Sequence, residues 1–214
     1  MQLRKKRKNR WGEVMTQVQE NTELMPWLEQ AMSEFYQHGL VVIKNAIPTE
    51  LCQALLREVS SSAALQPAGV GRQNQLQLNN DIRRDYTQWL DGSSHAQQQY
   101  LQRLDLLQQQ INRRCFLGLT HYECHFARYQ QGDFYQKHLD AFKGRSNRVL
   151  TTVCYLNSVQ VGGELAIYDE HDQLLQQIQP TQGTLIMFES ERFPHEVKAA
   201  GDLRFSIAGW FRKD

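Results

Sequence analysis

The stretch YQKHLDAF, residues 135–142, places a histidine and an aspartate two positions apart, at His138 and Asp140. The aromatic and apolar residues around them favour a short strand. Side chains two positions apart on a strand project from the same face. Because neither group is stable on a buried apolar face without a polar partner, the stretch predicts a polar site on a strand.

His138 and Asp140 provide two of the three ligands of a two-histidine, one-carboxylate metal site, a set that suits non-haem Fe(II) and leaves positions open. The second histidine is expected from a later strand. His171 lies in the polar turn YDEHDQ, residues 168–173, where a solvated loop residue explains it. His195 follows an apolar run and opens a strand, so we favour it, although an HxD pair alone is a weak signal.

Arg204 is the candidate anion ligand of the same site. A two-residue turn at Ala200-Gly201 would form a hairpin that pairs residue 197 with 204, which places Arg204 on the face of His195. A buried guanidinium is costly unless an anion meets it, and two-pronged capture of a carboxylate is its natural use. A three-residue turn would instead place Arg204 on the face opposite to His195.

The hydrophobic pattern predicts one α+β domain with helices first and a β-core second. Apolar residues at helical spacing predict helices over 24–37, 49–60 and 95–116, a buried strand over 40–43 and a loop over 61–75. The chain shows no internal repeat and no linker. Eight short β-prone runs then suggest an antiparallel sandwich or barrel, at residues 122–129, 134–139, 149–156, 164–168, 174–178, 184–188, 195–198 and 203–211.

Composition narrows the function classes. The net charge of +1 over 214 residues commits the chain to neither nucleic acid nor membrane. Residues 1–20 form a basic tail, expected to be a disordered solubilising end rather than a nucleic-acid contact. No run approaches the roughly 20 apolar residues of a membrane span. With no export signal, we expect a cytoplasmic protein whose scattered cysteines are reduced and pack as small apolar residues; they are Cys52, Cys115, Cys124 and Cys154.

Five stretches together carry a resemblance to a known family: ARYQQGDFYQKHLD (127–140), RVLTTVCYLN (148–157), GGEL (162–165), FPHEV (193–197) and RFSIAGWF (204–211). They resemble the Fe(II)- and 2-oxoglutarate-dependent oxygenases, most of all the prolyl 4-hydroxylases of the hypoxia-sensing type and their bacterial relatives, over about residues 80–212. The resemblance implies a double-stranded β-helix, or jelly roll. Its core would span 119–212, with helical support from 21–118, in a single domain 21–214.

The resemblance also implies the site. His138, Asp140 and His195 correspond to the iron ligands, and Arg204 and Tyr155 to the partners of the distal (C5) carboxylate of 2-oxoglutarate. Tyr129 corresponds to an aromatic that closes the co-substrate pocket, and Leu165 and Trp210 to its walls. Fe(II), 2-oxoglutarate and O2 are therefore expected, with ascorbate as a candidate stimulant. Asp140 disfavours halogenation, because halogenating relatives lack this carboxylate.

The segment DIRRDYTQWLDG, residues 81–92, resembles the mobile finger that protein-directed prolyl hydroxylases place over their substrate. It makes Arg83, Asp85 and Trp89 candidate substrate-binding residues, together with Tyr135 and Arg148. We expect Asp85 to pair with Arg148 and so hold the finger closed. His125 departs from the family pattern: it is expected on the inward face of its strand, where it either tunes substrate choice or hydrogen-bonds in the core.

The implied reaction couples decarboxylation of 2-oxoglutarate to hydroxylation of a prolyl residue in a protein, giving succinate and CO2. The implied partner is elongation factor Tu in bacterial relatives and a hypoxia-inducible transcription factor in animal ones. We favour the bacterial type, because the chain is compact and carries no zinc-finger module. The alternatives are a hydroxylase of free amino acids or other small molecules, a non-catalytic sensor of 2-oxoglutarate or iron and, last, a nucleic-acid demethylase. The oligomeric state stays open.

Overall fold

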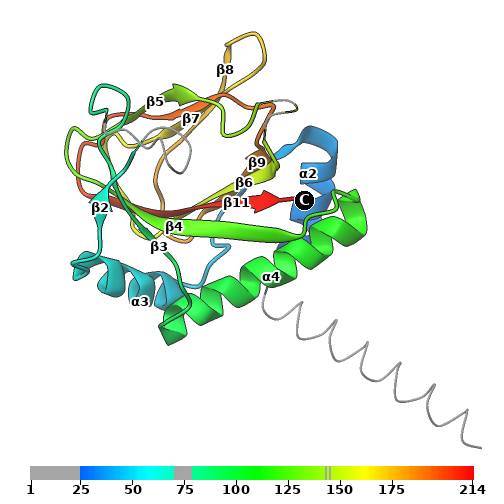
Figure 1. Cartoon of the computed structure of the whole chain (residues 1–214), viewed down its shortest axis with the longest axis horizontal. Coiled ribbons are helices and arrows are strands. Elements are labelled where there is room, and N and C mark those ends of the chain that lie inside the picture. The colour runs from blue at the N-terminus through cyan, green and yellow to red at the C-terminus, as the bar shows by residue number, and fades with distance from the viewer. Residues whose placement is uncertain (1–24, 70–78, 143, 145) are drawn as a thin grey trace, which may run out of the picture.

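Two antiparallel sheets face one another in the computed structural model, which describes residues 25–69, 79–142, 144 and 146–214. The basic tail predicted over residues 1–20 lies outside these residues. The large sheet has the strand order β1-β9-β6-β11-β4-β3-β2, and the small sheet has the order β5-β10-β7-β8. Figure 1 shows α3 and α4 along one side of the large sheet, with β5, β7 and β8 on the other side.

The elements follow the sequence predictions closely. The helices are α2 (Leu28–His38), α3 (Thr49–Ser60) and α4 (His95–Cys115). The large sheet contains β1 (Leu40–Ile43), β2 (Gln66–Pro67), β3 (Tyr86–Trp89), β4 (His121–Tyr129), β6 (Arg148–Tyr155), β9 (Leu185–Glu189) and β11 (Arg204–Arg212). The small sheet contains β5 (Tyr135–His138), β7 (Leu165–Tyr168), β8 (Leu174–Ile178) and β10 (His195–Val197).

The three helices pack on the outer face of the large sheet. The predicted apolar stripe of α4 is buried there, through Tyr100, Leu104, Leu107 and Ile111. Ser94 caps this helix, because its side chain accepts a hydrogen bond from the Gln97 amide at 3.0 Å. A second apolar cluster lies between the two sheets. Helices on one face thus leave the other face of the large sheet free to build a site with the small sheet.

The α+β jelly-roll prediction is confirmed, with one correction to its layout. Besides the predicted strand β1, the first half of the chain also supplies β2 and β3 to the large sheet. β2 lies inside the predicted loop 61–75 and is only two residues long. β3 lies inside the predicted finger and pairs with β4. Short edge strands such as these carry little periodic signal, because their position depends on pairing with a distant strand.

The predicted hairpin between residues 197 and 204 is wrong. β10 pairs with β5 and β7 in the small sheet, whereas β11 lies between β4 and β6 in the large one. The intervening backbone turns toward residues 133 and 161–163 instead, where the Ala200 amide donates to the Asp133 carbonyl and the Gly201 amide to the Val161 carbonyl. Arg204 nevertheless faces the space between the sheets, because it lies opposite the inward-facing Tyr129 on β4.

Candidate active site

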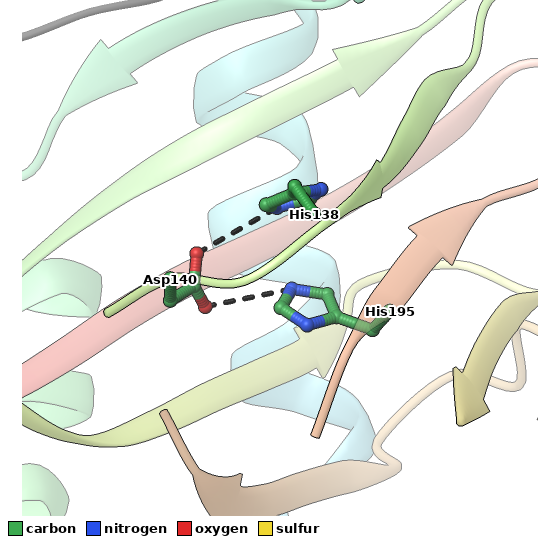
Figure 2. Close-up of side chains that lie close together, drawn as sticks. All are labelled: His138, Asp140 and His195. Carbon is green, nitrogen blue, oxygen red and sulfur yellow. Dashed lines mark ion pairs between the residues drawn. The ribbon is translucent and has the colours of Figure 1, made fainter. Parts of the chain in front are cut away.

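Three ionisable side chains meet between the sheets at one end of the small sheet. His138 ends β5, Asp140 follows two residues later, and His195 opens β10 directly opposite His138. Figure 2 shows the two imidazoles facing the two oxygens of Asp140. His138 Nε2 lies 3.6 Å from Asp140 Oδ1, and His195 Nε2 lies 3.4 Å from Oδ2. The three ligand atoms all lie within 4.8 Å of one another, a spacing that suits one metal ion.

Backbone carbonyls fix the orientation of both imidazoles. Nδ1 of His138 lies 2.8 Å from the Gln136 carbonyl oxygen, and Nδ1 of His195 lies 3.0 Å from the Phe193 carbonyl oxygen. A carbonyl oxygen only accepts, so each Nδ1 carries a proton, which leaves Nε2 as the ring nitrogen that faces a metal. Such a second contact is typical of metal-ligating histidines, because it sets the tautomer and the ring orientation.

Asp140 is held as a carboxylate. Burial raises its pKa, but the neighbouring His195 and His138 and a hydrogen bond from Thr151 outweigh burial and hold the pKa of this carboxyl well below its usual range. Thr151 Oγ1 donates to Asp140 Oδ2 at 2.7 Å. Burial lowers the pKa of His195 to about 4, so that this ring is neutral at neutral pH. One carboxylate and two imidazoles with free Nε2 atoms form a donor set that fits Fe(II).

Arg204 brings a cation into the interior. It is 1 % exposed, and its Cζ lies 4.7 Å from the ring centre of Tyr129 and 4.9 Å from that of Tyr155. Nη1 donates to Ser206 Oγ at 3.0 Å. Within the described residues Nε has no hydrogen-bond partner and no carboxylate pairs with the guanidinium. A buried guanidinium left in this way fits an anionic ligand such as a carboxylate.

The sheet register connects Arg204 to the triad. The inward face of β11 runs from Arg204 through Ser206 and Ala208 to Trp210. Trp210 lies opposite Thr151 on β6, whose hydroxyl contacts Asp140. Leu165, which is 1 % exposed on β7, closes the space from the small sheet. A molecule with two acidic ends could then bind between the sheets, with one end at Arg204 and the other at the metal ligands.

The Tyr155 hydroxyl would have to exchange its present hydrogen-bond partner to bind the co-substrate carboxylate as predicted. Its hydroxyl, buried in the pocket, donates to the Ile178 carbonyl at 3.2 Å. A hydroxyl has one proton, so donation to a co-substrate carboxylate requires it to leave Ile178. Its ring lies beside Arg204, as the sequence predicts, and its hydrogen bond to the co-substrate stays a prediction.

The predicted pair between Asp85 and Arg148 is wrong. Asp85, 1 % exposed, accepts two hydrogen bonds from Arg83, at 2.7 Å from Nε and 2.6 Å from Nη2. Arg148 instead pairs with Glu123 at 3.0 Å and lies over the ring of Trp210 at 4.0 Å. The reason is geometric: Arg83 lies two residues from Asp85 and reaches both carboxylate oxygens with its planar fork.

His125 faces inward, as predicted, beside two tryptophans. Its ring centre lies 5.2 Å from that of Trp89 and 5.3 Å from that of Trp210. Nδ1 lies 2.9 Å from the Phe126 carbonyl oxygen, so the core hydrogen bond is present. Burial, and next the charge of Arg83, lowers the pKa of His125 to about 4. Trp89 remains 54 % exposed, so this aromatic group extends from the site to the surface.

Sequence reasoning missed the polar residues that support the site. Thr151 donates a hydrogen bond to Asp140, and its Oγ1 lies 2.9 Å from Ser190 Oγ. Ser206 accepts a hydrogen bond from Arg204, and Glu123 accepts one from Arg148. Thr151 was detectable, because it shares the alternate-residue face of β6 with Tyr155. Ser190 was not detectable, since only the sheet pairing brings it to Thr151. His171 is exposed in its loop, as expected.

Comparison with known proteins agrees with this geometry. A sequence model of the 2OG-Fe(II) oxygenase superfamily matches residues 124–212. The crystal structure of a Pseudomonas putida prolyl-4-hydroxylase is 36 % identical, with a TM-score of 0.78, and the match covers 87 % of this chain and 99 % of that one. A prolyl hydroxylase from Trichoplax adhaerens, solved with a hypoxia inducible factor peptide fragment, is 26 % identical, with a TM-score of 0.79 and 92 % of each chain covered.

Egl nine homolog 1 of mouse and of human are each 28 % identical to this chain, in alignments that cover 86 % of it. The chain spans about half the length of these curated relatives, 49 % of the mouse protein and 46 % of the human one. Fold and site together define an iron- and 2-oxoglutarate-dependent oxygenase. The chain belongs to the 2OG-Fe(II) oxygenase superfamily, within its prolyl 4-hydroxylase group.

Proposed function

We propose that this protein hydroxylates a prolyl residue of a protein substrate, with Fe(II), 2-oxoglutarate and O2. The observation that carries the proposal is the co-location, between the two sheets, of the His138–Asp140–His195 triad and the buried Arg204, which pairs with no carboxylate of the described residues. When bound, the iron with its co-substrates supplies the oxidation of a C–H bond, coupled to decarboxylation of 2-oxoglutarate to succinate and CO2.

The chain itself binds, orients and excludes water. The triad holds the metal from one side and leaves the other side to ligands. Arg204 anchors the distal carboxylate and thereby sets the direction in which the co-substrate lies. Phe188 packs its ring against His195 at 4.7 Å, and Leu165 closes the pocket from the small sheet. These apolar walls strengthen the charge interactions inside the pocket, because they keep water out.

Two exposed aromatic side chains support a protein substrate. Trp89 is 54 % exposed beside His125, and Phe142, two residues after Asp140, is 61 % exposed. Exposed aromatic residues next to a site are typical of peptide-binding surfaces. The Trichoplax adhaerens relative was solved with a peptide fragment. By resemblance to the bacterial relatives, elongation factor Tu is the first substrate to test, and the cytoplasm the expected location.

In the direct test, purified protein with Fe(II), 2-oxoglutarate and ascorbate is incubated with elongation factor Tu. We expect one added oxygen atom on a proline by mass spectrometry, together with succinate. His195→Ala and Asp140→Ala should abolish both products, since two ligands hold iron poorly, whereas His171→Ala, in an exposed loop, should retain them. Near-normal succinate from His195→Ala would remove the triad from the reaction.

A small-molecule hydroxylase gives a different result in the same assay. Succinate formation would then rise with free amino acids and stay at its substrate-free rate with proteins. To separate the two, Trp89→Ala should reduce modification of a protein substrate more than substrate-free succinate formation. Equal rates in Trp89→Ala and the unaltered protein on a protein substrate would count against the aromatic surface as a substrate contact.

A further inference from the structure

Residues 81–89, here called the bridging segment, connect the two sheets. Its second half is β3, which pairs with β4 of the large sheet. Its first half lies along β5 of the small sheet: Arg83 forms a bridge with Tyr135, the Arg84 amide donates to the Phe134 carbonyl at 3.1 Å, and the Gln136 amide donates to the Ile82 carbonyl at 2.8 Å. The segment therefore holds the strand that carries His138.

A buried ion pair occupies the corner of the bridging segment. Asp85 receives two hydrogen bonds from Arg83, and the side chain of Asp85 is fully buried. Although burial lowers the pKa of Arg83, the bond to Asp85 outweighs it and raises this pKa above the usual range. A two-pronged contact fixes the plane of the guanidinium as well as its position. Arg83 is thus oriented by Asp85.

The oriented guanidinium lies over Tyr135, and Tyr135 stacks on a metal ligand. Arg83 Cζ is 4.2 Å from the ring centre of Tyr135. The rings of Tyr135 and His138 are 3.7 Å apart at their centres, with an angle of 18° between their planes. Residues three apart on a regular strand point to opposite faces. Here the register shifts between the pairs His195–His138 and Val197–Tyr135, and such a bulge brings both side chains to one face.

We propose that Arg83 and Asp85 are positioning residues for the metal ligand His138, and that they act through Tyr135. The proposal rests on the proposed function only in that His138 binds a metal. The carbonyl of Gln136 fixes Nδ1 of His138, and the stacked Tyr135 ring fixes the tilt of its plane. A peptide that moves the bridging segment would therefore change the ligand geometry of the metal.

The test measures metal binding without turnover. Metal-free protein is titrated with Co(II), and the visible absorption of bound Co(II) reports both affinity and ligand geometry. Contacts that orient a metal ligand typically change affinity by about 10- to 100-fold when they are removed. We expect Tyr135→Leu and the double variant Arg83→Met/Asp85→Leu to weaken Co(II) binding by about tenfold and to alter the spectrum. The double variant removes both charges, which avoids leaving Asp85 buried and unpaired.

Two variants control for general damage. Tyr135→Phe keeps the ring and should bind Co(II) as the unaltered protein does. Arg84→Met removes a similar contact from the same segment, since Arg84 Cζ lies 4.9 Å from the ring of Phe134 and its Nε donates to the Asn80 carbonyl. Within the described residues the Phe134 ring stacks on no metal ligand, and the Arg84 backbone bond to β5 stays in place, so Arg84→Met should also leave Co(II) binding unchanged.

Combining Tyr135→Leu with Arg83→Met/Asp85→Leu should weaken Co(II) binding no more than Tyr135→Leu alone, because all act along one path. Additive losses would overturn the path through Tyr135. Unaltered affinity and spectrum in the Arg83→Met/Asp85→Leu protein would overturn the proposal outright, as would an equal loss in Arg84→Met. Unaltered Co(II) binding in His138→Ala would instead refute the metal site, and with it the proposed function.

Discussion

Arg204 is the residue on which co-substrate binding depends most directly. Arg204→Lys replaces a planar two-pronged donor by a point charge on a flexible stem. We expect the affinity for 2-oxoglutarate to fall by about 1.5–3 kcal/mol, roughly tenfold to a hundredfold, the usual loss for a charge-assisted hydrogen bond. Calorimetric titration of the Mn(II)-loaded protein with 2-oxoglutarate measures this loss of affinity.

Arg192→Lys is the matched control, because Arg192 is a half-exposed arginine paired with Glu189 at 3.5 Å. It should bind 2-oxoglutarate as the unaltered protein does. Tyr155→Phe should weaken binding less than Arg204→Lys. Identical titrations for Arg204→Lys and the unaltered protein would exclude Arg204 from the co-substrate site.

His125 gives a prediction on the pH dependence of stability. Its folded pKa is lowered from 6.5 to about 4, so the unfolded chain binds the proton first as the pH falls. The free energy of unfolding should therefore decrease from about pH 6.5 downward and level off near pH 4, by about 3 kcal/mol from this residue. Urea unfolding across this range should show a smaller decrease for His125→Met. Parallel curves for the two proteins would mean that His125 does not titrate in this way.

At the scale of elements, the turn that leads into β7 shapes the Arg204 pocket. Gly163 has φ +69°, and a Cβ there would lie 3.0 Å from Arg204 Cδ. Gly163→Ala should therefore destabilise the fold by about 1–2 kcal/mol through its backbone and also weaken 2-oxoglutarate binding through Arg204. Gly118 has φ +66° with nothing within 4 Å of its Cβ position, so Gly118→Ala should show the loss of stability alone. Equal 2-oxoglutarate affinities in the two variants would contradict the contact.

The alternation of residues along each strand allowed the strands of the active site to be predicted from the sequence. Which of these strands pair could not be predicted. His138, Asp140 and His195 were predictable because each lies in or just after a short strand with its own local pattern. The pairing of β10 was mispredicted, since a turn at residues 200–201 satisfies local geometry equally well in a hairpin. Backbone hydrogen bonds to residues 133 and 161 decide against that hairpin, and these contacts are distant in sequence.

At the scale of the whole molecule, the metal should stabilise the fold, because its three ligands come from two strands and the short segment that follows one of them. A ligand that binds only the folded state stabilises it by about 2.7 kcal/mol at a hundred times its dissociation constant. Mn(II) should therefore raise the melting temperature of the unaltered protein, and a chelator should reverse the rise. Asp140→Ala should show no rise, and a rise equal to that of the unaltered protein would place the metal elsewhere.

Within the described residues, no helix combines the length and the apolar composition that a membrane crossing requires. Helices α2 to α4 instead use their apolar faces to cover the large sheet. One face of the large sheet is therefore covered by the helices, and the opposite face carries the residues of the candidate active site. The bridging segment joins the two sheets at the edge of the site, which makes it the part of the fold best placed to connect substrate contact with the metal.

The amino-acid sequence by itself determined the α+β class, the helices α3 and α4, the strands β1 and β4 to β11, and the candidate ligands, because helix and strand periodicity and short motifs are local properties. Only the tertiary structure decided which strands pair, that Asp85 contacts Arg83 rather than Arg148, and that Tyr135 stacks on His138. Each of these depends on side chains or strands brought together across the sheets, or on a bulge that reverses the face of a residue. Such contacts depend on the packing of the whole chain, and no local pattern encodes them.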